Sequence, residues 1–158
     1  LIEHKVALKG LVLLDPFGMN LNWDTISSLK GASIDLWILV PSGVIINRLL
    51  ERDGSLKHIE KLKQYFGLPK EEIENRFYIK KIDKTLFGEV EKKEKVKEPI
   101  KKIAALYVER LNTLFRYVTP EPLVMTNTRG VPIFHFVFAS NNKNAMRIAQ
   151  QIISKKSR

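Results

Sequence analysis

Apolar runs that end at turns, each followed by a helical pattern, restrict the fold of this chain more than any other feature. Residues 11–14 are all apolar and stop at Asp15-Pro16, and residues 34–40, broken only by Asp35, stop at Pro41. An unbroken apolar run that ends at a turn is typical of a strand buried on both faces. After each run, apolar side chains recur at three-to-four spacing, which predicts a helix. Strands that alternate with helices predict a parallel sheet with helices on its faces.

The rest of the chain predicts further helices and a closing hairpin. Helical spacing is expected over 55–66, from residue 68 onward and over 100–115. Residues 80–99 are rich in lysine and interleaved with acids, which predicts a mobile loop or an insertion. The runs 123–126 and 131–139 flank a turn at 127–130, so an antiparallel hairpin is expected, followed by a last helix.

Composition excludes several kinds of site. Cysteine is absent, which excludes a disulfide framework, thiolate metal sites and cysteine nucleophiles. His4, His58 and His135 lie far apart without metal-ligand spacing, so no metal site is expected. The absence of cysteine also fits a reducing cytoplasm. No apolar run reaches the roughly 18 residues of a membrane span, so no membrane partner is expected. The net charge of +10 permits binding to nucleic acid or another anionic partner.

The first candidate site is the turn that follows residues 11–14. The carboxyl end of a parallel strand is where ligands bind in open α/β sheets. Asp15 offers a carboxylate that can accept hydrogen bonds from a substrate amine, Pro16 stiffens the turn, and Phe17 offers a flat apolar face beside Gly18. The alternative interpretation is an ordinary Asp-Pro turn followed by a core phenylalanine.

The second candidate site follows the next predicted strand at the same edge of the sheet. Ser42 and Gly43 begin a predicted helix whose backbone N–H groups can face an anion, and Asn47 and Arg48 lie one turn further on. The alternative is a tight turn followed by a surface arginine.

The last predicted strand carries one histidine among aromatic residues. His135 alternates with Phe134 and Phe136, which favours a packed strand residue over a catalytic base. Phe134, Phe136 and Phe138 share one face, which suits either base stacking or, more commonly, core packing. The lysines of residues 80–102 either contact phosphates or form a solvated face, and the interleaved acids favour the solvated face.

Scattered blocks of the chain together resemble the three-Cys-motif partner family, prokaryotic proteins similar to Rossmann-like, AdoMet-dependent methyltransferases. The order and spacing of the blocks carry this resemblance over most of the chain outside residues 80–117. The name refers to the cysteines of the partner protein, so the absence of cysteine here is no conflict. The blocks are residues 13–19, 24–26, 35–44, 47–50 and 136–141.

The resemblance implies an α/β fold: the C-terminal half of a Rossmann-like, methyltransferase-type three-layer sandwich, whose mostly parallel sheet ends in an antiparallel hairpin. Residues 1–158 would form a single partial domain, with 80–99 as the loop or insertion. The first residue is Leu and not Met, so we expect an upstream, cofactor-binding half to be missing.

The resemblance also implies roles for the first candidate site. Residues 15–18 stand where amino-methyltransferases carry a D/N-P-P-[YF] motif, with Phe17 in place of the second proline and Gly18 in place of the aromatic residue. Asp15 would accept the protons of the target amine, Phe17 would stack or line the pocket, and Asn47 and Arg48 would line the substrate edge. The cofactor of a complete protein would be S-adenosylmethionine, although this chain has no segment like methyltransferase motif I.

Three functions remain open at this point. The first is an AdoMet-dependent methyltransferase-like domain directed at nucleic acid and inactive as this fragment. The second is a non-catalytic module that binds a partner protein, such as a three-Cys-motif protein, or nucleic acid. The third is a different nucleotide-dependent enzyme on the same fold. A homodimer is a further expectation, because the exposed edge of the first strand needs cover.

Overall fold

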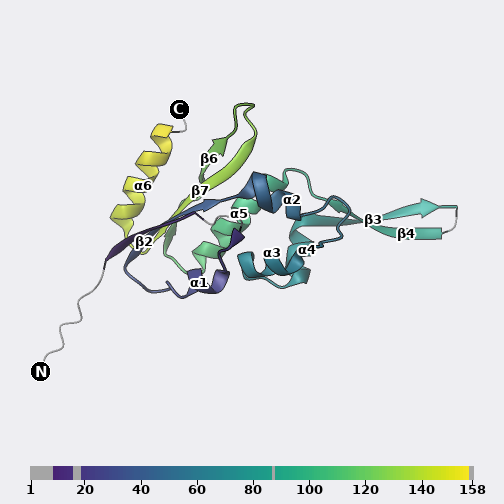
Figure 1. Cartoon of the computed structure of the whole chain (residues 1–158), viewed down its shortest axis with the longest axis horizontal. Helices are drawn as coiled ribbons and strands as arrows, with labels where there is room; N and C mark the ends of the chain where they lie inside the picture. Colours follow the sequence, from purple (N-terminus) through teal and green to yellow (C-terminus); the bar gives the residue numbers. More distant parts are fainter. Residues whose placement is uncertain (1–8, 16–18, 87, 157–158) are drawn as a thin grey trace, which may run out of the picture.

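The computed structural model describes residues 9–15, 19–86 and 88–156, arranged around one mixed sheet (Figure 1). Among these residues no helix is both long and apolar enough to cross a membrane. The elements, in chain order, are β1 (Gly10–Leu14), α1 (Trp23–Ser27), β2 (Ile34–Val40), the π-helical turn η2 (Ser42–Ile46), α2 (Asn47–Leu49), α3 (Ile59–Phe66), α4 (Lys70–Phe77), β3 (Tyr78–Thr85), β4 (Gly88–Lys95), α5 (Pro99–Asn112), β5 (Tyr117–Val118), β6 (Leu123–Thr126), β7 (Pro132–Ser140) and α6 (Lys143–Lys156).

The main sheet has the strand order β1-β2-β7-β5, and β6 also pairs with β7. β1 and β2 run parallel, with Leu14 opposite Ile38. β7 is antiparallel to β2, to β5 and to β6. The α/β fold and the closing hairpin are therefore confirmed. The main sheet is mixed: β1, β2, β5 and β6 run in one direction, and β7 runs in the opposite direction between β2 and its other neighbours. The expectation of a mostly parallel sheet therefore holds for the direction of the described strands, although β1–β2 is the one parallel pair among them.

Alternation along β2 divides the core between the two faces of the sheet. Leu36, Ile38 and Val40 are buried in the larger cluster, to which α1, α3, α4 and α5 also contribute. Trp37 points to the other face and packs with Phe138 of β7 against α6. Helices thus cover both faces of the sheet.

One face of β1 is exposed to solvent. Leu11 is 70% exposed and Leu13 is 66% exposed, whereas Val12 and Leu14 are half-buried. The expectation that residues 11–14 are buried on both faces is therefore wrong. The reason is positional: β1 lies at the end of the strand order, while α6, on the same face as Leu13, packs over β7.

The segment expected to be a loop over 80–99 is instead a long antiparallel ribbon. β3 and β4 pair from Tyr78 opposite Lys95 to Thr85 opposite Gly88, and the ribbon extends away from the rest of the molecule (Figure 1). Although lysines lie directly opposite one another in the ladder, the interleaved acids form ion pairs with them on the diagonal, which lets so polar a segment form strands. Lys80 lies 3.0 Å from Glu91. That the ribbon is an insertion stays a prediction.

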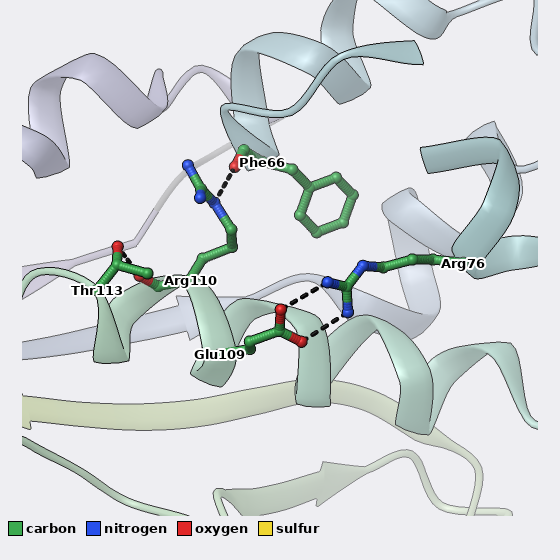
Figure 2. A network of polar contacts seen from close by, with 5 residues as sticks. All are labelled: Phe66, Arg76, Glu109, Arg110 and Thr113. Atoms are coloured by element: carbon green, nitrogen blue, oxygen red, sulfur yellow. Dashed lines mark hydrogen bonds and ion pairs between the residues drawn. The ribbon is translucent and has the colours of Figure 1, made fainter. Parts of the chain in front are cut away.

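Two arginines join α5 to α3 and α4 (Figure 2). Arg76 of α4 donates two hydrogen bonds of 2.6 Å to the carboxylate of Glu109. Arg110 donates from Nε to the Phe66 carbonyl at 2.8 Å and from Nη2 to the Gly67 carbonyl at 3.0 Å. Arg110 thereby satisfies carbonyls that the end of α3 leaves unpaired. These contacts fix α5, which forms one wall of the groove described below.

Candidate nucleic-acid interface

Asp15 lies directly after β1, at the carboxyl edge of the parallel strand pair, and its side chain is exposed. Pro16, Phe17 and Gly18 lie outside the described residues. The roles expected for these four residues therefore stay predictions.

Ser42 is buried and shares a hydrogen bond with a histidine from β7. Its Oγ lies 2.7 Å from Nδ1 of His135, and the two residues are 0% and 4% exposed. Burial lowers the pKa of His135, which favours the neutral ring. Because solvent does not reach the pair, it serves to satisfy two buried polar groups and not to attack an external substrate.

Gly43 lies against the first residue of β7. A Cβ at Gly43 would stand 2.0 Å from the carbonyl oxygen of Pro132, so the backbone can approach this closely only without a side chain. Pro41 and Ser42 beside it are buried. The residues expected to form an open anion site are therefore part of a packed contact between η2 and β7.

Asn47 is engaged by a lysine from the ribbon. Nζ of Lys95 donates to Oδ1 of Asn47 at 2.7 Å and to the carbonyls of Asn47 and Leu50 at 2.6 Å each. Burial is the main cause that lowers the pKa of Lys95, and the nearby positive charge of Arg52 lowers it further. Asn47 thus belongs to the junction between α2 and the ribbon, whereas Arg48 is exposed.

The described residues at this edge do not fit AdoMet. The turn after β1 lies partly outside the described residues, and the turn after β2 is closed by Ser42 and Gly43. The described part of the chain also holds no group of three or more His, Cys, Asp or Glu side chains that could bind a metal. No methyl-transfer step is therefore derived from these residues.

A different surface has the shape of a binding site. α5, β5 and α6 enclose a groove of about 890 Å³. A hollow of about 630 Å³ adjoins it and shares Asn112 and Arg116. We call the two together the basic groove. It is lined by Lys30, Gly31, Ala105, Val108, Asn112, Thr113, Leu114, Phe115, Arg116, Tyr117, Val118, Pro120, Asn141, Lys143, Asn144, Met146, Arg147 and Gln150.

Every charged residue that lines the basic groove is a cation. These residues are Lys30, Arg116, Lys143 and Arg147, and all four are exposed. Glu109, which shares α5 with the groove wall, points to Arg76 of α4 instead (Figure 2). The Arg76 guanidinium lowers the pKa of Glu109, so this carboxylate stays ionised and engaged away from the groove. The groove therefore attracts anions.

Hydrogen bonds hold the walls of the groove together. The backbone N–H of Arg116 donates to Oδ1 of Asn141 at 3.0 Å, which links the start of β5 to the loop before α6. The N–H of Asn142 donates to Oγ of Ser140 at 2.8 Å. The Ser140 hydroxyl donates to Oδ1 of Asp35 at 2.5 Å. This series of contacts runs from β2 to the start of α6 and fixes the position of its cations.

The floor of the groove is apolar. Val108 of α5, Val118 of β5 and Met146 of α6 are buried, and Tyr117 is half-buried against the cluster beneath α6. Exposed amides complete the lining: Asn112, Asn144 and Gln150.

Sequence reasoning missed the basic groove because its residues come from separate parts of the chain. One signal was available. Residues 122–156 contain five lysines and arginines and no Asp or Glu: Arg129, Lys143, Arg147, Lys155 and Lys156.

Comparison of the chain with protein-family models, curated proteins and solved structures gave no match. The proposals below therefore rest on the geometry and charge of the chain's own residues.

Proposed function

We propose that this chain is a nucleic-acid-binding module whose contact surface is the basic groove. The observation that carries the proposal is that all charged side chains lining the groove are cations. Contacts from Lys, Arg and amide side chains to phosphates supply most of the sequence-independent affinity for nucleic acid. The net charge of +10 adds long-range attraction to a polyanion.

Fluorescence anisotropy with a labelled strand of about 12 nucleotides tests this proposal. We expect affinity to fall steeply between about 50 and 200 mM salt, because each phosphate contact releases about 0.7 counterion from a single strand. Arg116→Gln and Arg147→Gln should each weaken binding and lower the slope of log affinity against log salt by roughly 0.7.

Arg52→Gln is the matched control, because it removes the same charge from an exposed arginine in the turn after α2, outside the lining of the basic groove. We expect this variant to bind as the wild type does. Equal losses in Arg52→Gln and Arg147→Gln would mean that net charge, and not the groove, governs binding. Failure of the wild type to bind at low salt would contradict the proposal outright.

A second candidate function is the methyltransferase-like domain, which we propose on the order of the strands. Two parallel strands, β1 and β2, are followed by an antiparallel hairpin, which agrees with the end of a Rossmann-like methyltransferase sheet. Asp15 stands at the carboxyl end of β1. In this proposal the chain belongs to the three-Cys-motif partner family, acts in the cytoplasm with such a partner, and supplies the substrate edge to a separate AdoMet-binding half.

Calorimetric titration with AdoMet separates the two candidates. Because the described residues do not fit the cofactor, we expect no heat of binding, together with nucleic-acid binding that AdoMet does not alter. Saturable AdoMet binding would favour the methyltransferase candidate, and loss of a substrate-dependent signal in Asp15→Ala would then assign the amine acceptor.

A further inference from the structure

Building on the proposed function, we infer that the basic groove binds single-stranded nucleic acid, with the bases on its apolar floor and the phosphates along its cationic rims. The floor, the cationic lining and the size of the groove together favour an unpaired strand.

The floor is a surface for bases and not for phosphates. Val118 and Met146 are buried beneath the groove, whereas Tyr117 is only partly buried and lines it. A duplex stacks the faces of its bases inside and presents its phosphates outside, so these side chains would have nothing to contact. In a single strand the base faces are free, and aromatic side chains stack on them without regard to sequence.

The lining carries cations from more than one element. Lys143 and Arg147 lie four residues apart on α6 and therefore share one face, with Gln150 three residues further along. Arg116 lies directly before β5 and lines both hollows of the groove. A strand lying along α6 can thus meet successive donors about one helical turn apart while its bases point to the floor.

The size of the groove argues against a buried duplex. A hollow of about 890 Å³ lies in the range that encloses small molecules, and it suffices for a few nucleotides of one strand. The adjoining hollow with Lys30 and Asn141 extends the path past Arg116. Amide side chains in both hollows can donate to and accept from the edges of unpaired bases.

The test compares ligands of equal strand length that differ in whether they present unpaired bases. Anisotropy is measured at one low salt concentration with oligo-dT, oligo-rU, the oligo-dT strand annealed to its complement, and an abasic strand of equal length. We expect either single strand to bind about tenfold or more tightly than the duplex and than the abasic strand. Tighter binding of oligo-dT or of oligo-rU shows which of the two strands the groove prefers, and either result supports the inference.

Variants of Tyr117 test the floor itself. Tyr117→Leu should weaken binding of oligo-dT about tenfold and leave the abasic strand unaffected, whereas Tyr117→Phe should bind as the wild type does. An abasic strand or a duplex that binds as tightly as oligo-dT would overturn the inference while leaving the proposed function intact. Absence of salt-dependent binding to any of the four ligands would instead refute the proposed function.

Discussion

His135 illustrates how burial decides the chemistry of a single residue. It is 4% exposed and its Nδ1 lies 2.7 Å from Ser42 Oγ, between two segments far apart in the chain. A histidine near a serine can act in catalysis, but only where a substrate can reach it. Here the pair joins η2 to β7, and its chemistry is that of a core hydrogen bond.

The lowered pKa of His135 predicts a dependence of stability on pH. The buried ring is neutral in the folded chain, whereas the unfolded chain takes up a proton as the pH falls below about 6.5. The neutral His135 therefore makes its full contribution to the free energy of unfolding above the pKa that the ring has in the unfolded chain. This contribution is lost as the pH falls toward the lower pKa of the ring in the folded chain. We expect the free energy of unfolding in urea to fall more steeply from pH 7 to pH 5 in the wild type than in His135→Gln. Equal slopes would contradict this account.

The close approach of Gly43 to Pro132 predicts that a side chain at position 43 lowers the free energy of unfolding. A Cβ at this position would meet the Pro132 carbonyl at 2.0 Å, so Gly43→Ala must displace η2 or the start of β7. We expect a loss of about 1–3 kcal/mol in the free energy of unfolding, measured in urea. Gly10→Ala is the control, because its Cβ would meet Ile34 at an ordinary 4.0 Å. The two variants should differ clearly, and similar losses would exclude the close approach as the cause.

At the scale of elements, the β3–β4 ribbon stands apart from the core. Tyr78 and Val96, at its base, belong to the larger cluster, whereas Ile79, Ile82 and Val90 along its length are exposed. Tyr78 also donates a hydrogen bond of 2.8 Å from its hydroxyl to the Glu51 carbonyl. The ribbon is therefore fastened at one end only.

Shortening the ribbon should leave the body intact. Lys80 and Lys93 lie opposite each other in the ladder, so replacing residues 81–92 with Asn-Gly closes the ribbon through a tight turn. We expect the free energy of unfolding in urea to change by less than about 1 kcal/mol, because no core residue is removed. Tyr78→Ala, at the base, should cost about 3 kcal/mol or more. If the shortened ribbon costs as much, the ribbon contributes to the core after all.

At the scale of the whole molecule, charge and apolar surface are separated. The cations of the basic groove lie beside α6, while β1 contains no charged residue and exposes Leu11 and Leu13. Among the described strands β1 pairs with β2 alone. An uncharged edge strand without lysine or proline is open to pairing with another chain.

Salt should therefore have opposite effects on two kinds of association. Nucleic-acid binding should weaken as salt rises, whereas self-association through β1 should strengthen, because screening reduces the repulsion between two chains of charge +10. By sedimentation velocity from about 0.05 to 0.5 M salt we expect a shift toward dimer in the wild type and none in Leu13→Lys. A wild type that stays monomeric throughout would exclude this use of β1.

The sequence by itself determined the elements formed by neighbouring residues. The final helix, the hairpin turn at residues 127–130 and the two strands before η2 all follow from local periodicity and turn residues. Such patterns act within a few residues, so they can be recognised without knowledge of the rest of the chain. The two strands of the β3–β4 ribbon were not predicted, because their sequences are dominated by charged residues and lack the apolar alternation that identifies a strand.

Tertiary structure decided which distant residues share a surface. It placed β7 beside β2, left one face of β1 open, paired Ser42 with His135, and brought Arg116 next to α6. Each outcome depends on the order of strands in the sheet and on which helix covers which face, and many orders are compatible with the same local patterns. The candidate site at the carboxyl edge could thus be predicted from the sequence, because its residues follow directly after predicted strands. The basic groove could be recognised only in the tertiary structure, because its walls come together only when β5, β7 and α6 pack against one another.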